Sequence, residues 1–238
     1  MASCPNCYQT MISHTLDAQA SVRTIDIDAC PACRLFWFDQ WESTGLAPRA
    51  VLNLFRYIGA TMQQKPTPLA SRFHCVRCHH ALDFTKDLQR TTPFNYWRCN
   101  LGHGKLISFH QFLREKNFIR TPSPPELARL RATIRQIACS QCGAPIDLAA
   151  DSGCGHCGAP IAMIDPDSVA KTIQELTARE LGGRTTTDGT VTGSALNHAQ
   201  IDALFSLERI RQREEHDDLV VIGIKAIGSL IGAFLLSR

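Results

Sequence analysis

The spacing of the cysteines constrains the fold of this chain more than any other feature. The eleven cysteines form five Cys-x-x-Cys pairs and one single residue, Cys99. They fall into three groups: 22 residues separate the two pairs of the first group, 20 separate Cys78 from Cys99, and 11 separate the two pairs of the third group. This spacing is typical of zinc ribbons, in which two tight turns joined by a hairpin present four ligands to one metal ion.

The first and third groups supply four thiolates each. A proline after the first cysteine presets the turn in the first group, and a glycine after the second cysteine allows a left-handed residue in the third. Tyr8 and Arg34 stand where that glycine would be in the first group. Iron or a redox dithiol is the alternative, but a thioredoxin-like dithiol needs one motif at a helix start, not paired motifs. We therefore expect two four-cysteine zinc sites, made by Cys4, Cys7, Cys30 and Cys33 and by Cys139, Cys142, Cys154 and Cys157.

The middle group lacks one ligand. Three thiolates come from Cys75, Cys78 and Cys99. The fourth ligand should lie where a second turn would place it, and His103 is one position later than a cysteine would be. Because the imidazole side chain reaches further than a thiol, we expect His103 to complete this site. The alternatives adjoin the first turn and would crowd it: His74, His79 and His80.

The three expected zinc ions are structural. A catalytic zinc keeps an open position for water, whereas each of these ligand sets closes at four. The sequence contains no glycine-rich phosphate loop, no nucleophile elbow and no paired carboxylates at one site. We therefore predict a protein that is not an enzyme and has no catalytic residues, with a metal-dependent enzyme as the weaker alternative.

The cysteine count also bears on location. An odd number of cysteines would leave one thiol over in a disulfide framework, and no signal peptide precedes the first motif. Metal-bound thiolates in a reducing compartment explain the count better than secretion does. We therefore expect a cytoplasmic protein.

The segments between the cysteine groups carry helical signals. Modules of about 40 residues bury too little apolar surface to be stable without a metal or disulfides. We expect a small, metal-stabilised α+β fold, in which three zinc ribbons of short antiparallel hairpins are joined by amphipathic helices and followed by a C-terminal apolar helix. The expected units are a first ribbon at 1–46, a helix and linker at 47–70, a second ribbon with a helix at 71–120, a linker and helix at 121–138, a third ribbon with a helix at 139–181, a flexible linker at 182–198, and a C-terminal helix with an apolar tail at 199–238.

The first ribbon resembles a known family. Cys4-Pro-Asn-Cys7 is followed by Ile25-Asp-Ile-Asp-Ala-Cys30-Pro-Ala-Cys33, then by Leu35-Phe-Trp37-Phe-Asp39 and Glu42. This order resembles the transcription factor IIB-type zinc ribbon of many small bacterial proteins, over residues 3–45. The resemblance implies a zinc-ribbon fold and a bound metal, and it implies transcription only by analogy.

Two details of that segment need comment. Leu35 and Phe36 stand where the family usually has glycines. Trp37 and Asp39 match the family pattern, and we expect structural roles for both, with Trp37 packed over the ribbon and Asp39 ordering the turn into the following helix.

Basic charge gathers in the middle of the chain. Residues 49–135 hold 15 Lys and Arg against 4 Asp and Glu, although the net charge of the whole chain is only +3. Aromatic residues lie among these cations, and the combination suits phosphate contact and base stacking, although the same aromatics could form a small core. We expect a binding or scaffold protein that engages a protein partner or a membrane-associated assembly. A nucleic-acid-binding, transcription-related regulator that uses residues 49–135 is the alternative.

The C-terminal segment 219–236 has eighteen residues, of which Lys225 is the only charged one. At a helical rise of 1.5 Å per residue, its length comes close to a bilayer core of about 30 Å. Lys225, Gly228, Ser229 and Gly232 share one helical face, which suits a helix pair equally well. Two interpretations stay open: a tether to the cytosolic face of a membrane, or a helix that mediates oligomerisation.

Overall fold

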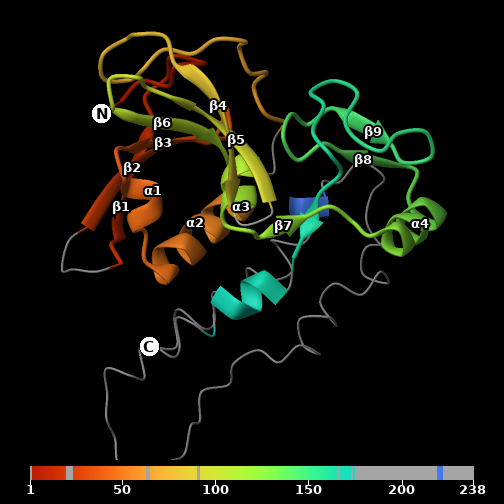
Figure 1. The fold of residues 1–238 in the computed structure, drawn as a ribbon. Coiled ribbons are helices and arrows are strands. Elements are labelled where there is room, and N and C mark those ends of the chain that lie inside the picture. The colour runs from red at the N-terminus through yellow and green to blue at the C-terminus, as the bar shows by residue number, and fades with distance from the viewer. Residues whose placement is uncertain are drawn as a thin grey trace, which may run out of the picture.

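A computed structural model describes residues 2–19, 24–62, 65–89, 92–165, 167–172, 174 and 219–221 (Figure 1). The expected flexible linker at 182–198 lies outside these residues. So does most of the expected C-terminal unit at 199–238, of which only 219–221 are described.

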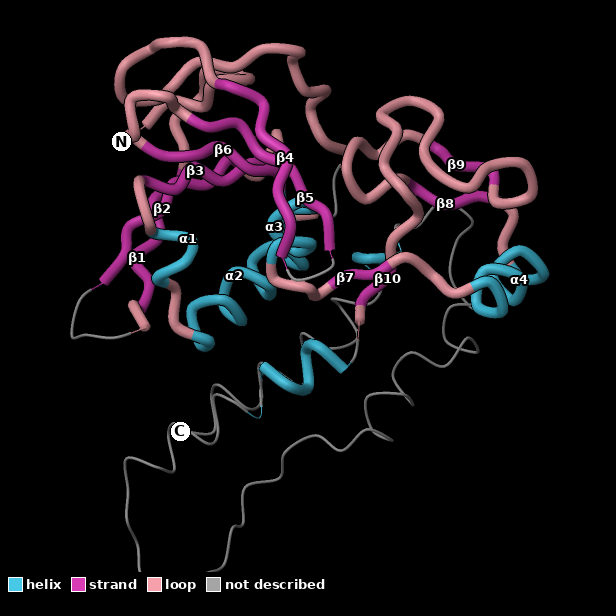
Figure 2. The backbone as a smooth tube through the Cα atoms, in the orientation of Figure 1, coloured by secondary structure: helices cyan, strands magenta, loops and turns pink. Residues whose placement is uncertain are grey.

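A six-stranded antiparallel sheet unites the first two ribbons, with the strand order β1-β2-β3-β6-β5-β4. The first ribbon contributes β1 (Ile12–Asp17), β2 (Thr24–Cys30) and β3 (Leu35–Asp39). The second contributes β4 (Asp83–Gln89), β5 (Thr92–Arg98) and β6 (Gly104–Ser108). The ribbons join where β3 pairs with β6, from Leu35 opposite Ser108 to Asp39 opposite Gly104. Figure 2 shows the resulting continuous sheet.

Helices cover one face of this sheet (Figure 1). They are α1 (Glu42–Gly45), α2 (Pro48–Thr61) and α3 (Phe109–Glu115). Because side chains alternate along a strand, Phe36, Phe38 and Ile107 share this face. All three are fully buried in a core that includes Phe55 of α2 and Phe112 of α3. This helix-side core is the larger apolar cluster of the two that flank the sheet.

Two helices that flank this core begin at residues that favour a helix start. Pro48 opens α2, where its fixed φ and missing N–H are tolerated. The Ser108 side chain accepts a hydrogen bond from the Gln111 N–H and so caps α3. Asn117, with a φ of 58°, takes the left-handed conformation that commonly follows a helix C-terminus.

The cysteine turns cover the opposite face. Leu35, Trp37 and Leu106 alternate with the helix-side residues and are buried there. They pack against the cysteines of the first two groups and against Phe73. The cysteine turns are therefore part of the second core, which we call the turn-side core.

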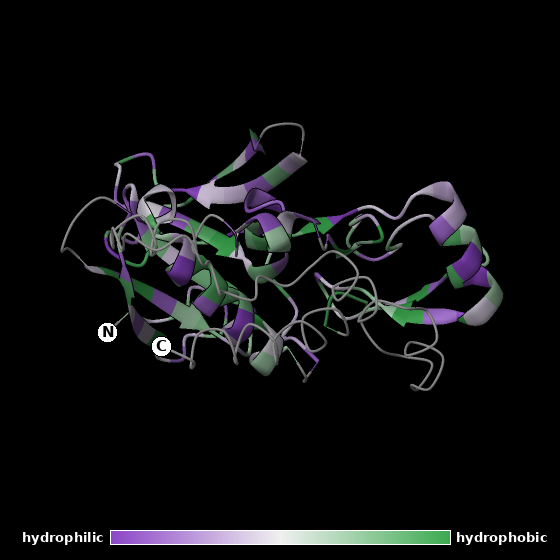
Figure 3. Ribbon diagram, turned by 90° about the horizontal axis from the view of Figure 1, so that it is seen from below, coloured by the Kyte–Doolittle hydropathy of each residue, from purple (hydrophilic) through white to green (hydrophobic). Residues whose placement is uncertain are grey.

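The third ribbon has a core of its own. It consists of α4 (Pro124–Thr133), β8 (Gln136–Ala138) and β9 (Pro145–Asp147) around a cluster that includes Leu130, Ile137 and Ile146. A capping box between Ser123 and Glu126 starts α4. Figure 3 shows this unit set to one side of the sheet. A short pairing between β7 (Ile119–Arg120) and β10 (Met163–Ile164) links it to the body (Figure 2).

The start of the apolar tail is buried in the body. Residues 219–221 are helical, and Val220 and Val221 belong to the helix-side core. Leu219 packs in the cluster of the third ribbon. These three residues therefore contact two cores at once.

The described structure agrees with a small α+β fold of antiparallel hairpins and three cysteine-rich clusters. The rest of the expected C-terminal apolar helix, from residue 222 onward, lies outside the described residues. Among the residues that are described, no helix has the length and apolar character needed to cross a bilayer.

Candidate metal centres

Four of the five Cys-x-x-Cys turns share the same pair of backbone hydrogen bonds, and in the fifth, at Cys30, the Arg34 N–H donates to the Pro31 carbonyl instead. In the first turn, the Tyr8 N–H donates to the Cys4 carbonyl at 2.9 Å, and the Cys4 N–H donates to the Gln9 carbonyl at 2.8 Å. The same two bonds recur in three further turns, which begin at Cys75, Cys139 and Cys154. The pattern fixes the backbone so that both thiols of a pair lie on the inside of the turn.

The residue that follows the second cysteine adopts a left-handed conformation whether or not it is glycine. Tyr8, Arg34 and His79 have φ values of 62°, 54° and 60°, close to the 71° of Gly143 and Gly158. A residue with a Cβ loses roughly 1–2 kcal/mol in this region. Because the φ values are similar, the turns of the first group keep the same geometry although Tyr8 and Arg34 stand in place of glycine.

The structure brings the twelve expected ligands into three groups of four. Within each group, the ligand atoms lie within 4.8 Å of one another. The sulfur atoms of Cys7 and Cys30 are 3.7 Å apart, and those of Cys142 and Cys154 are 3.6 Å apart. Four bonds of about 2.3 Å to a tetrahedral ion place sulfurs about 3.8 Å from one another, whereas a disulfide needs about 2.05 Å. The separations therefore fit a shared metal ion, and all eleven cysteines are free thiols.

His103 lies in the middle group. Its Nδ1 is 3.5 Å from the sulfur of Cys99 and 3.9 Å from that of Cys75. The Cys99 N–H donates to the Gly104 carbonyl at 2.9 Å, so the turn closes as the others do, with the ligand one position later. His80 points elsewhere, with its Nδ1 3.2 Å from the Cys78 carbonyl oxygen.

Four crowded thiols cannot all ionise without a compensating cation. In the first group, hydrogen bonds from Cys30 and Cys4 lower the pKa of Cys33 to about 2. The hydrogen bond to Cys33 raises the pKa of Cys30 in turn. In the third group, the hydrogen bond to Cys157 and burial raise the pKa of Cys139. A divalent cation at the centre of each group would remove this conflict, because it would stabilise every thiolate.

Trp37 has the packing role expected of it, whereas the turn after β3 is ordered by the Asp39 backbone and not by its carboxylate. Trp37 is buried in the turn-side core, and its Nε1–H donates to Asp39 Oδ1 at 2.7 Å. The Asp39 N–H donates to Glu42 Oε2 at 2.6 Å, which fixes the passage from β3 into α1. Partial burial raises the pKa of Glu42 to about 7, although the Asp39 N–H acts in the opposite direction.

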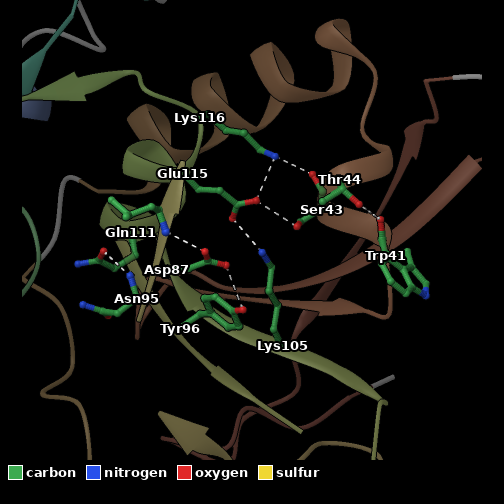
Figure 4. A network of polar contacts seen from close by, with 11 residues as sticks. Trp41, Ser43, Thr44, Asp87, Asn95, Tyr96, Lys105, Gln111, Glu115 and Lys116 are labelled. Atoms are coloured by element: carbon green, nitrogen blue, oxygen red, sulfur yellow. Dashed lines mark hydrogen bonds and ion pairs between the residues drawn. The ribbon is translucent and has the colours of Figure 1, made fainter. Parts of the chain in front are cut away.

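A buried ion cluster that no sequence motif indicates lies on the helix side of the sheet (Figure 4). Glu115 accepts from Lys105 at 3.0 Å, from Lys116 at 3.3 Å and from the Ser43 hydroxyl at 3.1 Å. The Lys116 ammonium also donates to the Ser43 carbonyl at 2.6 Å. These contacts join α1, β6 and α3. Two of the basic residues of segment 49–135, Lys105 and Lys116, therefore stabilise the fold through ion pairs with Glu115.

Gly104 is a second position that sequence reasoning missed. It follows His103 and pairs with Asp39 across the joint between the two ribbons. Its φ is 146°, and a Cβ at this position would meet the Phe38 carbonyl oxygen. The residue order Gly102-His103-Gly104 was the available signal, because glycines on both sides of a ligand indicate a tight backbone approach.

Comparison with models of protein families, with curated proteins and with solved structures finds no match to this chain.

Proposed function

We propose that this chain is a non-catalytic binding protein whose surfaces are held in place by three structural zinc ions. The observation that supports this most is the spacing of the ligand atoms, which matches a closed tetrahedron in each group. Zinc is the ion that sites of four thiolates, or of three thiolates and one imidazole, most commonly hold. A metal with four protein ligands has no position for a water, so it stabilises structure instead of activating a substrate.

Two further properties support the proposal. The cysteines of the first two groups are buried or half-buried in the turn-side core, so the metal ions would also organise the sheet. The eleven thiols, none of which forms a disulfide, suit a reducing and hence cytoplasmic compartment. The proposal includes a zinc-ribbon fold for residues 3–45, because the sequence there resembles the transcription factor IIB-type ribbon.

The sequence suggested a protein or membrane-associated partner partly because of the apolar tail. Residues 219–221 of that tail are buried in the body, which makes them unavailable as a free docking surface. Residues 222–236 lie outside the described residues, so the two interpretations of the rest of the tail, a membrane tether or an oligomerisation helix, stay predictions.

Native mass spectrometry and cobalt substitution test this proposal together. We expect three zinc ions per chain. We also expect the cobalt-substituted protein to show the intense visible absorption of tetrahedral thiolate sites, with no change when azide is added. A catalytic metal has an open position, so azide would bind it and alter the spectrum. Fewer than three zinc ions, or an azide-sensitive spectrum in the unaltered protein, would contradict the proposal.

The His103→Ala variant tests the ligand scheme of the middle site, and His80→Ala is its matched control. The first variant removes one ligand from the middle site and leaves three thiolates, so the cobalt at this site should become sensitive to azide. His80→Ala changes a neighbouring histidine whose ring faces a backbone carbonyl. It should keep three zinc ions and an azide-insensitive cobalt spectrum.

A further inference from the structure

The hairpin of β4 and β5 has one face that is covered at Trp97 by Phe73 and is otherwise left largely open by the described chain. Phe84, Lys86 and Leu88 of β4 alternate onto the turn side of the sheet, opposite Trp97, Asn95 and Pro93 of β5. Phe84 is 53% exposed and Leu88 is 63% exposed. Figure 3 shows the hairpin standing out from the body. We call this surface, made by residues 84, 86, 88, 93, 95 and 97, the hairpin face.

A row of aromatic rings connects the hairpin face to the turn-side core. Phe73 is fully buried and meets Trp97 edge to face at a centroid distance of 4.7 Å. Trp97 in turn meets Phe84 at 5.7 Å. The exposed ring of Phe84 is therefore the outer end of a row whose inner end is fixed beside the middle metal site. Such a ring is held in place before any ligand arrives, which lowers the entropy lost on binding.

The hairpin itself is held firmly on its inner edge. Where β6 no longer pairs with β5, side chains of α3 replace it: Gln111 accepts from the Asn95 N–H at 3.0 Å, and Arg114 donates to the Pro93 carbonyl at 2.7 Å. Figure 4 shows Gln111 beside Asn95. The β5 strand of the hairpin is thus anchored to α3 as well as to β6.

The charge on this face is of one sign. Lys86 is the only charged residue among the six, and exposed Arg72 immediately precedes Phe73. The carboxylates of β4 alternate onto the opposite face, where Asp87 accepts from the Tyr96 hydroxyl at 3.4 Å. Carboxylates on the turn side of the sheet lie two or more strands away, on β2 and β3.

We propose that the hairpin face binds single-stranded nucleic acid, with an unpaired base stacked on the Phe84 ring and Lys86 against the phosphate backbone. This inference rests on the proposed binding role and names its partner class. Exposed aromatic rings beside cations bind unpaired bases because every base has a π-face and the backbone is anionic. A duplex hides those π-faces, so it should compete poorly.

Fluorescence anisotropy with a labelled oligothymidylate of about 20 nucleotides tests the proposal on the full, zinc-loaded chain. We expect binding that weakens as salt rises. Phe84→Ala should weaken it about tenfold, because one stacked base is lost. Lys86→Gln should reduce the slope of log K against log salt by about one. Tyr8→Ala removes an aromatic ring of the first ribbon that is even more exposed, at 79%, and should leave binding unchanged.

Several outcomes would overturn the inference: no binding at low salt, equal losses for Phe84→Ala and Tyr8→Ala, or preference for a duplex. A photo-reactive phenylalanine at position 84 that crosslinks only to protein in cells would also overturn it and would assign the face to a protein partner. Each of these results leaves the proposed function intact if the unaltered chain still holds three azide-insensitive metal ions. A failure of that metal test would instead count against the proposed function itself.

Discussion

Arg77 and Asp39 join the first ribbon to the second across the turn side of the sheet. Arg77 lies inside the turn between Cys75 and Cys78, and its Nε donates to Asp39 Oδ1 at 3.1 Å while its Nη2 donates to Oδ2 at 3.0 Å. The same Nη2 lies 3.4 Å from Asp28 Oδ2. A metal-binding turn of one ribbon is therefore attached directly to the strands of the other.

The Asp39→Asn variant should weaken this attachment. It removes the charge of the carboxylate and one of the two parallel hydrogen bonds, and both side chains are 39% exposed, so solvent screening limits the loss to about 1 kcal/mol. Urea unfolding of the zinc-loaded protein would measure it. Combined with Arg77→Ala in a double-mutant cycle, the two changes should couple by a similar amount.

The control for that cycle is Asp26→Asn. This carboxylate also lies on the first ribbon, but it accepts from Thr15 on the adjacent strand. Its replacement should add independently to Arg77→Ala. Additive effects for Asp39→Asn as well would show that the bidentate pair does not contribute to the joint.

The ligand groups could be read from the sequence because they depend on local spacing. Two cysteines three positions apart lie in one turn whatever surrounds them, and the interval to the next turn fits one hairpin. The prediction for His103 needed one further step: the middle group has three cysteines, so a tetrahedral site there lacks one ligand. The structure brings these same residues together, to within 4.8 Å in each group.

The union of the two ribbons could not be read in the same way. Leu35 and Ser108 pair although 72 residues lie between them along the chain. The sequence of neither strand identifies the strand with which it pairs. In the sequence, Arg77 is one of the basic residues of segment 49–135. Its contact with Asp39 depends on the pairing of β3 with β6. The burial of Val220 likewise depends on where two cores meet, which no periodicity encodes.

Gly104→Ala should disrupt the joint between the ribbons. A Cβ at this position meets the Phe38 carbonyl oxygen and lies 2.9 Å from the Asp39 Cα, and its φ of 146° disfavours any residue with a side chain. We expect a loss of roughly 3 kcal/mol or more in the free energy of unfolding. Gly155→Ala is the matched control, because nothing lies within 4 Å of a Cβ there. Equal losses in urea unfolding would refute the steric argument.

Glu115→Gln should destabilise the helix side of the sheet. The change leaves the ammonium groups of Lys105 and Lys116 without a carboxylate while both are largely buried, and breaking such a pair costs about 3 kcal/mol. Glu126→Gln is the control: its carboxylate pairs with Arg120 at 2.6 Å but both side chains are about one-third exposed. We expect a loss below about 1 kcal/mol for this variant. The prediction fails if chemical denaturation shows the two losses to be alike.

Glu42→Gln should make stability less dependent on pH. Burial raises the pKa of Glu42 to about 7, above the ordinary value of 4.5. Between those two values the folded state binds more protons than the unfolded state, so this residue lowers stability as pH rises through the window. The glutamine variant lacks that loss and can still accept from the Asp39 N–H. With zinc in excess, its unfolding midpoint should exceed that of the parent by more at about pH 8 than at about pH 6.

Glu126→Gln is the control for this pH dependence, because Arg120 lowers the pKa of Glu126 to about 2. This variant should show the same difference from the parent at both pH values. A constant difference for Glu42→Gln would mean that this carboxyl does not titrate in the folded protein over that range.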